Sequence, residues 1–226
     1  MIGHQTEAAE PVGNNGRMNH LVLLGDSIFD NRAYVADGPA IIDQVKHLAP
    51  QGWQVSLLAV DGNTSAQISQ QLQRMPQDAT QLVLSVGGND ALGCLPQLDA
   101  AASNVIGALG SLAELLARFR YSYTALMAEL LALNKPLMIC TVYDSVPGLT
   151  DALRAALSLF NDVILREAIR CGVPVLDLRM ICTEPGDYSE KSPIEPSSGG
   201  GAKLADRLVT AVQEHDFKKR GCRVYS

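Results

Sequence analysis

The sequence has no run of apolar residues long enough to cross a membrane. Its most apolar stretch, residues 105–117, contains two glycines and Glu114. It falls short of the roughly 20 apolar residues that a membrane-spanning helix needs. Residues 1–17 are polar and lack the apolar segment of a secretory signal peptide. These absences predict a soluble, cytoplasmic protein without a membrane span.

Paired cysteines at the spacing of a metal site are also missing. The five cysteines stand singly at Cys94, Cys140, Cys171, Cys182 and Cys222. An odd, scattered set is typical of reduced thiols in the cytoplasm rather than of a disulfide framework. Neither GxGxxG nor GxxxxGK[ST] follows the first apolar run, which argues against a nucleotide-binding protein. We therefore expect no metal and no cofactor.

Positive charge is scarce. The chain has 18 Lys and Arg residues against 24 Asp and Glu residues, which gives a net charge of −6 at pH 7. Its one basic cluster, Lys218-Lys219-Arg220, lies close to the end of the sequence. Nucleic acids and anionic membranes bind clustered Lys and Arg side chains, so we expect neither as a partner.

Short apolar segments alternate with segments that have the apolar spacing of helices. The expected strands are 21–24, 54–60, 81–86, 136–142 and 173–178. The expected helices are 39–49, a short one after Thr64 or Ser65, one long or two shorter ones over 98–133, then 152–170 and 200–214. This alternation indicates parallel strands joined by right-handed crossovers. The sequence predicts an α/β fold, a three-layer α/β/α sandwich with five strands.

One domain accounts for most of the chain, because no linker or repeat interrupts the alternation. We expect a loose N-terminal tail over 1–18, the domain over 19–217 and a C-terminal tail over 218–226. The helical region 98–133 fits two positions, over the active edge of the sheet or in the core.

Three of the expected strands end in small polar residues. These ends are Gly25-Asp26-Ser27, Asp61-Gly62-Asn63 and Gly87-Gly88-Asn89-Asp90. Ligands of open α/β sheets bind at the carboxyl ends of the strands, so the three ends are expected to share one crevice. A hydroxyl nucleophile with N–H donors around it is what acyl transfer needs. Each end alone also fits an ordinary turn.

These motifs resemble those of the SGNH (GDSL-type) hydrolases, which are serine esterases, lipases and acyl hydrolases on a flavodoxin-like sheet. The resemblance covers roughly residues 21–212. It implies that Ser27 is the nucleophile and that the Ser27 N–H, the Gly62 N–H and the Asn89 side chain hold the oxyanion. Asp26, Gly88 and Asp90 are expected to bind the substrate, an ester or other acyl compound.

The fourth motif departs from the family pattern of Asp-x-x-His before the last helix. The matching stretch is Ser192-Pro193-Ile194-Glu195, so Ser192 stands at the aspartate position and Glu195 at the histidine position. The four histidines are His4, His20, His47 and His215. By their places in the expected fold, none of them is a convincing base for Ser27.

Two functions are consistent with Glu195 at that position. In the first, Glu195 is the base of a serine ester hydrolase. An ordinary Glu has a pKa of about 4.3 and is a weak base unless burial or like charges raise that pKa. In the second, the protein has lost catalysis and binds an acyl or carbohydrate-like ligand without turnover, and Glu195 binds a backbone N–H or a cationic group.

Overall fold

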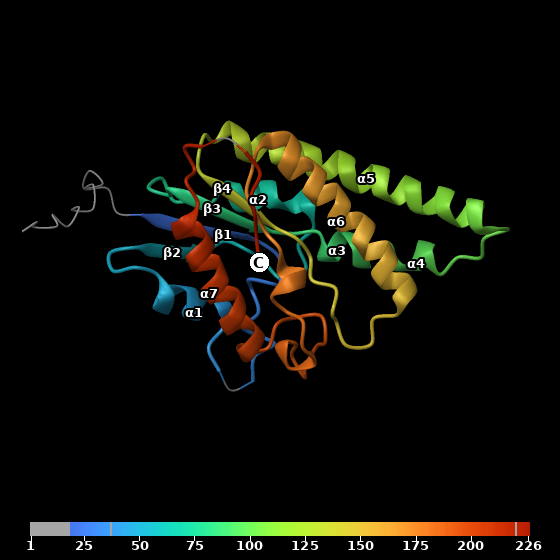
Figure 1. Ribbon diagram of the computed structural model, residues 1–226, viewed down its shortest axis with the longest axis horizontal. Helices are drawn as coiled ribbons and strands as arrows, with labels where there is room; N and C mark the ends of the chain where they lie inside the picture. The colour runs from blue at the N-terminus through green and yellow to red at the C-terminus, as the bar shows by residue number, and fades with distance from the viewer. Residues whose placement is uncertain (1–18, 37, 220) are drawn as a thin grey trace, which may run out of the picture.

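The sheet has six parallel strands in the order β2-β1-β3-β4-β5-β6. A computed structural model describes residues 19–36, 38–219 and 221–226 (Figure 1). The strands are β1 (His20–Gly25), β2 (Gln54–Leu57), β3 (Gln81–Ser85), β4 (Leu137–Cys140), β5 (Val175–Leu176) and β6 (Val224–Tyr225). The first five have the flavodoxin-like order, which confirms the predicted fold class.

The predicted strand number is wrong by one. Val224–Tyr225, placed in the expected C-terminal tail 218–226, forms β6 beside β5. The N–H of Asp177 donates to the carbonyl oxygen of Tyr225 at 2.7 Å. Two residues are too few to show a strand period, which is why the sequence pattern missed them. The expected N-terminal tail, 1–18, lies outside the described residues.

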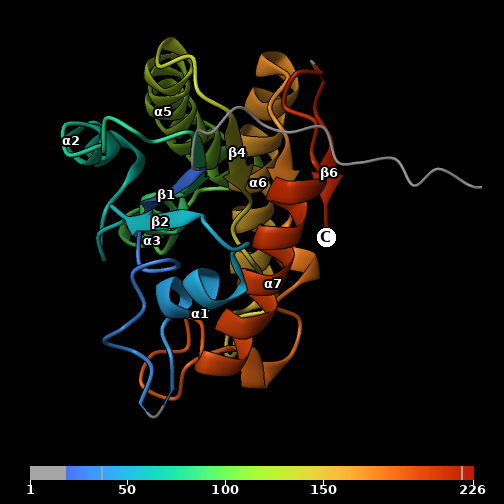
Figure 2. The same cartoon turned by 90° about the vertical axis from the view of Figure 1, so that its left-hand side faces the viewer.

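Helices cover both faces of the sheet, as the three-layer prediction requires (Figure 2). The α-helices are α1 (Ile41–Leu48), α2 (Ile68–Leu72), α3 (Gly88–Leu92), α4 (Leu95–Leu98), α5 (Val105–Ala132), α6 (Asp151–Cys171) and α7 (Ser198–Glu214). Three single 3-10 turns are η1 (Ser65–Gln67), η2 (Leu178–Met180) and η3 (Pro185–Asp187). In the part of the chain that is described, none of these helices has the length and apolar character to cross a membrane.

Successive side chains of each strand point to opposite faces of the sheet, so the hydrophobic core has two parts. In β1, Leu21 and Leu23 pack with α1 and α7, whereas Val22 and Leu24 pack on the opposite face with α2, α5 and α6. All four side chains are fully buried. Because both faces are covered, the central strands are apolar throughout, which is the pattern typical of parallel sheets.

Most of the region 98–133 forms one long helix, α5, which begins at Val105 and runs without a break through Gly107 and Gly110. Its C-terminal half buries residues such as Phe119 and Tyr123 against the sheet. Its first turns are exposed and extend beyond the sheet beside α4 (Figure 1). The helix is therefore part of the core in one half only.

Gly25 closes β1 at a point where β1 approaches β3 very closely. Its φ is +138°, and a Cβ atom there would overlap the carbonyl oxygen of Ser85. The amide side chain of Gln71 accepts from Gly25 N at 2.9 Å and donates to Gly25 O at 2.7 Å. Only glycine fits this position, so the turn that follows begins at a fixed point.

Replacing Gly25 by alanine should destabilise the protein by about 3 kcal/mol or more, because both steric overlap and an unfavourable φ oppose the new side chain. Gly52→Ala is the matched control: its φ is +86° and no atom lies within 4 Å of the added Cβ. The control should cost about 1 kcal/mol. Urea unfolding of both variants measures the difference, and equal losses would contradict the overlap.

Candidate active site

Ser27 lies in the turn directly after β1, at the carboxyl edge of the sheet. The N–H groups of Phe29 and Asp30 donate to the carbonyl oxygen of Asp26, at 3.2 and 3.0 Å, which makes a single helical turn. The residue before Ser27, Asp26, donates its own N–H to Ser85 O at 3.2 Å. Ser27 is buried but lines the apolar cavity described below.

Gly62 and Asn89 lie at the ends of the two strands that flank β1. Gly62 has φ +79° and open space where a Cβ would stand. Asn89 lies in the first turn of α3, and its Nδ2 donates to the carbonyl oxygen of Asn63 at 3.0 Å. The backbone N–H groups of Ser27 and Gly62 donate to no acceptor among the described residues. These N–H groups are therefore available to a ligand.

Glu195 is brought to Ser27 by the loop that precedes α7. Glu195 is only 4% exposed, and the hydroxyls of Ser192 and Ser27 are close enough to its carboxyl to lower the pKa of that group. Its Oε2 has no partner within the described part of the chain. The residue at the histidine position of the family motif thus stands beside the candidate nucleophile.

Burial raises the pKa of the Glu195 carboxyl above its ordinary value. The Ser192 hydroxyl lowers this pKa, the negative charge of Asp61 raises it, and the Ser27 hydroxyl lowers it; the net direction is upward. A raised pKa makes a carboxylate a stronger base, which answers the objection that an ordinary glutamate is too weak.

Asp26 is almost fully buried beside the cavity. Its Oδ1 accepts the Ile28 N–H at 3.1 Å. Burial raises the pKa of Asp26 to about 7, the Ile28 hydrogen bond lowers it, and the charges of Asp90 and Glu195 raise it further. Near neutral pH this carboxyl is therefore close to half protonated.

Asp90 has a different environment from the other polar residues of its turn. Its carboxylate accepts the N–H of Ser65 at 2.9 Å and the hydroxyl of Ser65 at 2.6 Å, which ties α3 to η1. Gly88 and Asn89 line the cavity and Asp90 does not. A direct role for Asp90 in substrate binding remains a prediction.

An apolar cavity of about 130 Å³ opens beside Ser27. Its polar end is formed by Asp26, Ser27 and Asn89. The apolar wall comes from the turn after β1, from α3, α4 and α6, from the segment after β4 and from the Glu195 loop. Its residues are Ile28, Ala91, Leu92, Leu95, Leu98, Val142, Tyr143, Val146, Leu149, Leu153, Ala156, Leu157, Phe160 and Ile194. Leu153, Leu157 and Phe160, which lie in the helix expected over 152–170, line this cavity.

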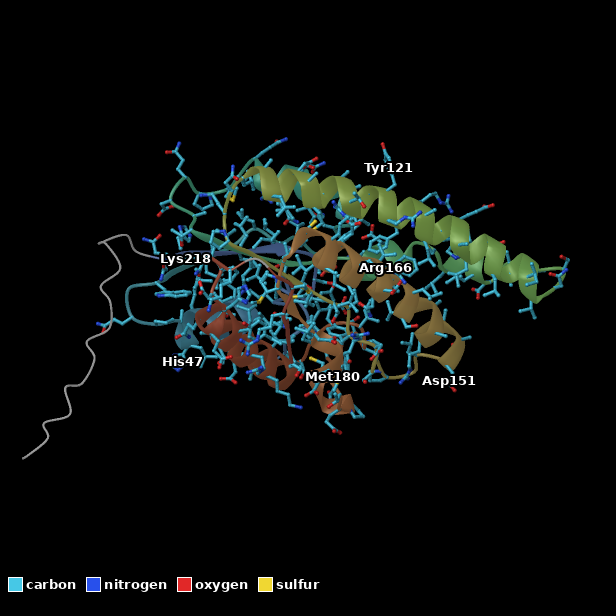
Figure 3. The ribbon with its side chains drawn as sticks, turned by 45° about the horizontal axis from the view of Figure 1, so that its top comes forward. His47, Tyr121, Asp151, Arg166, Met180 and Lys218 are labelled. Carbon is cyan, nitrogen blue, oxygen red and sulfur yellow. The ribbon has the colours of Figure 1, made fainter. Side chains whose placement is uncertain are left out.

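The histidines that the structure describes belong to other parts of the molecule. His20 begins β1, at the opposite end from Ser27, and its ring bonds Asp78 at 2.9 Å and Ser56 at 2.8 Å. His47 is exposed near the end of α1 (Figure 3). His215 follows α7 and bonds the Tyr225 hydroxyl at 2.9 Å. His4 lies outside the described residues.

Metal ligands do not gather at this site. Within residues 19–36, 38–219 and 221–226, no group of three or more His, Cys, Asp or Glu side chains is arranged to hold a metal ion. The arrangement has the groups that acyl transfer needs. The Glu195 carboxylate can activate the Ser27 hydroxyl, and the N–H groups of Ser27 and Gly62 can hold a developing negative charge.

Several residues of the site carry no motif and were missed by sequence reasoning. Gln71 binds Gly25 and also donates from Nε2 to Asn63 Oδ1 at 2.9 Å, so it links two of the three strand ends. Asn31 and Tyr143 bond the backbone on either side of Glu195. Their contacts join segments far apart in sequence, and periodicity gives no sign of them.

Asp26 should make stability depend on pH. Its pKa of about 7 in the folded state exceeds the ordinary 3.8, so the folded protein holds the proton more tightly and loses stability as pH rises through this window. Asp26→Asn cannot titrate. Between pH 5 and pH 8 the stability of the variant relative to the native chain should improve by about 2 to 3 kcal/mol, as measured by urea unfolding. A difference that is the same at both pH values would contradict this pKa.

The fold is similar to the folds of several solved structures. An extracellular lipase from Streptomyces rimosus superposes with TM-score 0.63 at 15% identity, covering 85% of this chain and 99% of its own. An acetylxylan esterase from Geobacillus stearothermophilus gives 0.63 at 15%, covering 89% and 98%. A lipase/acylhydrolase from Enterococcus faecalis gives 0.60 at 20%, covering 87% and 96%. At these identities the likeness shows the fold alone.

No curated protein sequence matches the chain. The model of the GDSL-like lipase/acylhydrolase family matches residues 23–200, which includes all three strand ends and the Glu195 loop. Together with the parallel sheet, this match over most of the chain shows that the protein belongs to the GDSL-like lipase/acylhydrolase family.

Proposed function

We propose that this protein is a serine ester hydrolase in which Ser27 is the nucleophile and Glu195 is its base. The observation that carries the proposal is the Glu195 carboxyl, buried at the histidine position of the family motif and within reach of the Ser27 hydroxyl. Membership of a family of lipases and acylhydrolases supports hydrolysis as the reaction.

In the first half of the reaction, Glu195 takes the proton of the Ser27 hydroxyl while Oγ bonds to the carbonyl carbon of the ester. The carbonyl oxygen gains negative charge, which the N–H groups of Ser27 and Gly62 and the amide of Asn89 hold. The C–O bond to the alcohol then breaks, and the alcohol leaves with the proton from Glu195. The acyl group remains on Ser27.

Water completes the cycle by the same route. It gives a proton to Glu195 as its oxygen bonds to the acyl carbon. The bond between that carbon and Ser27 Oγ breaks, and Oγ takes the proton back from Glu195. The products are a carboxylic acid and the original serine, and no cofactor is consumed.

The cavity indicates which part of the substrate is recognised. An apolar space beside the nucleophile, with its polar groups confined to the Ser27 end, suits the hydrocarbon part of an acyl chain. We therefore propose esters of apolar carboxylic acids as the substrates, with the chain lying between α4 and α6.

A protein that binds the same ligand without turnover is the second candidate. The observation in its favour is that none of the histidines in the described residues lies beside Ser27.

We also propose a cytoplasmic location. The proposal is supported by the five cysteines, which all lie within the described residues and are all free thiols.

Hydrolysis of p-nitrophenyl butyrate tests the proposed pair. Ser27→Ala should abolish activity, and Glu195→Gln should lower kcat by about a hundredfold or more, because the neutral amide cannot accept the serine proton. In the native chain kcat/KM should fall as pH drops through the raised pKa of Glu195. This fall of kcat/KM at low pH, the acid limb of the pH profile, should be absent from the residual activity of Glu195→Gln.

Each other result has a distinct meaning. Activity lost in Ser27→Ala and kept in Glu195→Gln would contradict Glu195 as the base. Native activity no greater than that of Ser27→Ala on esters of several acyl lengths, with acyl ligands still bound, would favour the binding protein.

Filling the cavity should shorten the acyl chains that the protein accepts. Ala156→Leu places a larger side chain on the cavity wall, and Ala155→Leu adds the same atoms on the exposed face of α6. The ratio of kcat/KM for p-nitrophenyl octanoate to that for the acetate should fall about tenfold or more in Ala156→Leu. It should not change in Ala155→Leu. Equal ratios in the two variants would place the acyl chain elsewhere.

A further inference from the structure

The backbone on either side of Glu195 is held by two buried side chains. The Tyr143 hydroxyl donates to the carbonyl oxygen of Ile194 at 2.5 Å. The Asn31 side-chain Nδ2 donates to the carbonyl oxygen of Pro196 at 3.1 Å. Both donors come from segments at the carboxyl ends of strands, Asn31 after β1 and Tyr143 after β4. The two bonds fix the Ile194–Glu195 and Pro196–Ser197 peptide groups, which lie on either side of Glu195.

Both side chains are themselves anchored to core elements. Asn31 Oδ1 accepts the N–H of Ile41, the first residue of α1, at 2.9 Å. The segment that carries Tyr143 is held by Asn161 of α6. The Asn161 side chain accepts from Val142 N and donates to Val142 O, each at 2.8 Å. The loop is thus tied to α1 on one side and to α6 on the other.

The loop also closes on itself around Glu195. The N–H of Ser189 donates to the Glu195 carbonyl oxygen at 2.8 Å, and the Glu195 N–H donates to the Ser192 carbonyl oxygen at 3.3 Å. With the backbone fixed in this way, the point from which the Glu195 side chain extends is also fixed. The carboxyl is buried and its Oε2 finds no partner among the described residues, an arrangement that a free loop would relax by turning toward water.

We propose that Tyr143 and Asn31 are positioning residues, which hold the Glu195 carboxyl buried and directed at Ser27. The proposal rests on the proposed function, because it assigns these side chains to the orientation of the base. Burial raises the pKa of the Tyr143 hydroxyl well above its ordinary value, so the phenol keeps its proton and remains a donor.

Tyr143→Phe removes the donor and keeps the ring that lines the cavity. The loop then gains freedom, and displacement of a catalytic group by about 1 Å can lower a rate by about a hundredfold. We expect kcat to fall between about tenfold and a hundredfold, with KM changed less than twofold. The acid limb of the pH profile should move to lower pH, because a Glu195 carboxyl that reaches water loses the burial that raises its pKa.

Tyr188→Phe is the matched control. Its ring stacks edge-on against that of Tyr143, with centroids 5.2 Å apart, and its buried hydroxyl also donates to a backbone carbonyl oxygen, that of Cys182, at 2.9 Å. The control loses the same kind of hydrogen bond without releasing Ile194 or Pro196. It should lower Tm by a similar amount and leave kcat and the acid limb of the pH profile unchanged.

Asn31→Asp tests the other side of the loop. It removes the donor to the Pro196 carbonyl oxygen and keeps the acceptor for the Ile41 N–H, and kcat should fall.

Double variants with Glu195→Gln separate this proposal from the proposed function. If Tyr143 and Asn31 act through Glu195, neither substitution lowers kcat further once Glu195 is Gln. Full additivity, or a Tyr143→Phe profile identical to that of Tyr188→Phe, would overturn the positioning role and leave Glu195 as the base. Native activity in Glu195→Gln would instead overturn the proposed function.

Discussion

The close approach of β1 and β3 at Gly25 is the constraint on which the site depends. The two strands pair in parallel with Gly25 opposite Ser85, and no side chain fits between them. Gln71 fixes the same glycine from its other side through both backbone groups. Because β1 ends at this fixed point, the following turn places Ser27 between the ends of β2 and β3, where Ser27 and Asn89 line one cavity. The candidate nucleophile is thus positioned by the strand register and by the hydrogen bonds of its own turn.

The partner of the serine is supplied in a different way, by a loop rather than a strand end. Glu195 comes from an irregular segment before α7, and its place depends on hydrogen bonds from the segments after β1 and β4. Burial raises the pKa of its carboxyl, and the negative charge of Asp61 raises it further. A carboxylate in this environment has an increased affinity for a proton, which is what the proposed role as the base of Ser27 needs. The burial that disfavours the charged form thus supports the chemistry proposed for it.

Sequence reasoning captured the parts of the molecule that rest on local pattern. Strands such as residues 21–24 are apolar on both faces, so the parallel sheet and its two helical layers could be predicted, and the polar strand ends indicated the candidate site. The position of Glu195 depends on hydrogen bonds between residues far apart in the sequence. Tyr143 and Ile194 are 51 residues apart, and Asn31 and Pro196 are 165 residues apart. No local period reveals such pairs, nor the use of Leu153 and Leu157 as a cavity wall. β6 was missed because its two residues pair only through the tertiary fold.

The reaction of Ser27 with a fluorophosphonate, followed by intact mass across pH, tests the Ser27–Glu195 pair most directly, because it reports the nucleophile without reference to any substrate. The account predicts one phosphonylated serine per chain, at Ser27. The rate should fall as pH drops through the raised pKa of Glu195, and Glu195→Gln should react far more slowly. Labelling of Glu195→Gln at the native rate, or no labelling of the native chain at any pH, would contradict it.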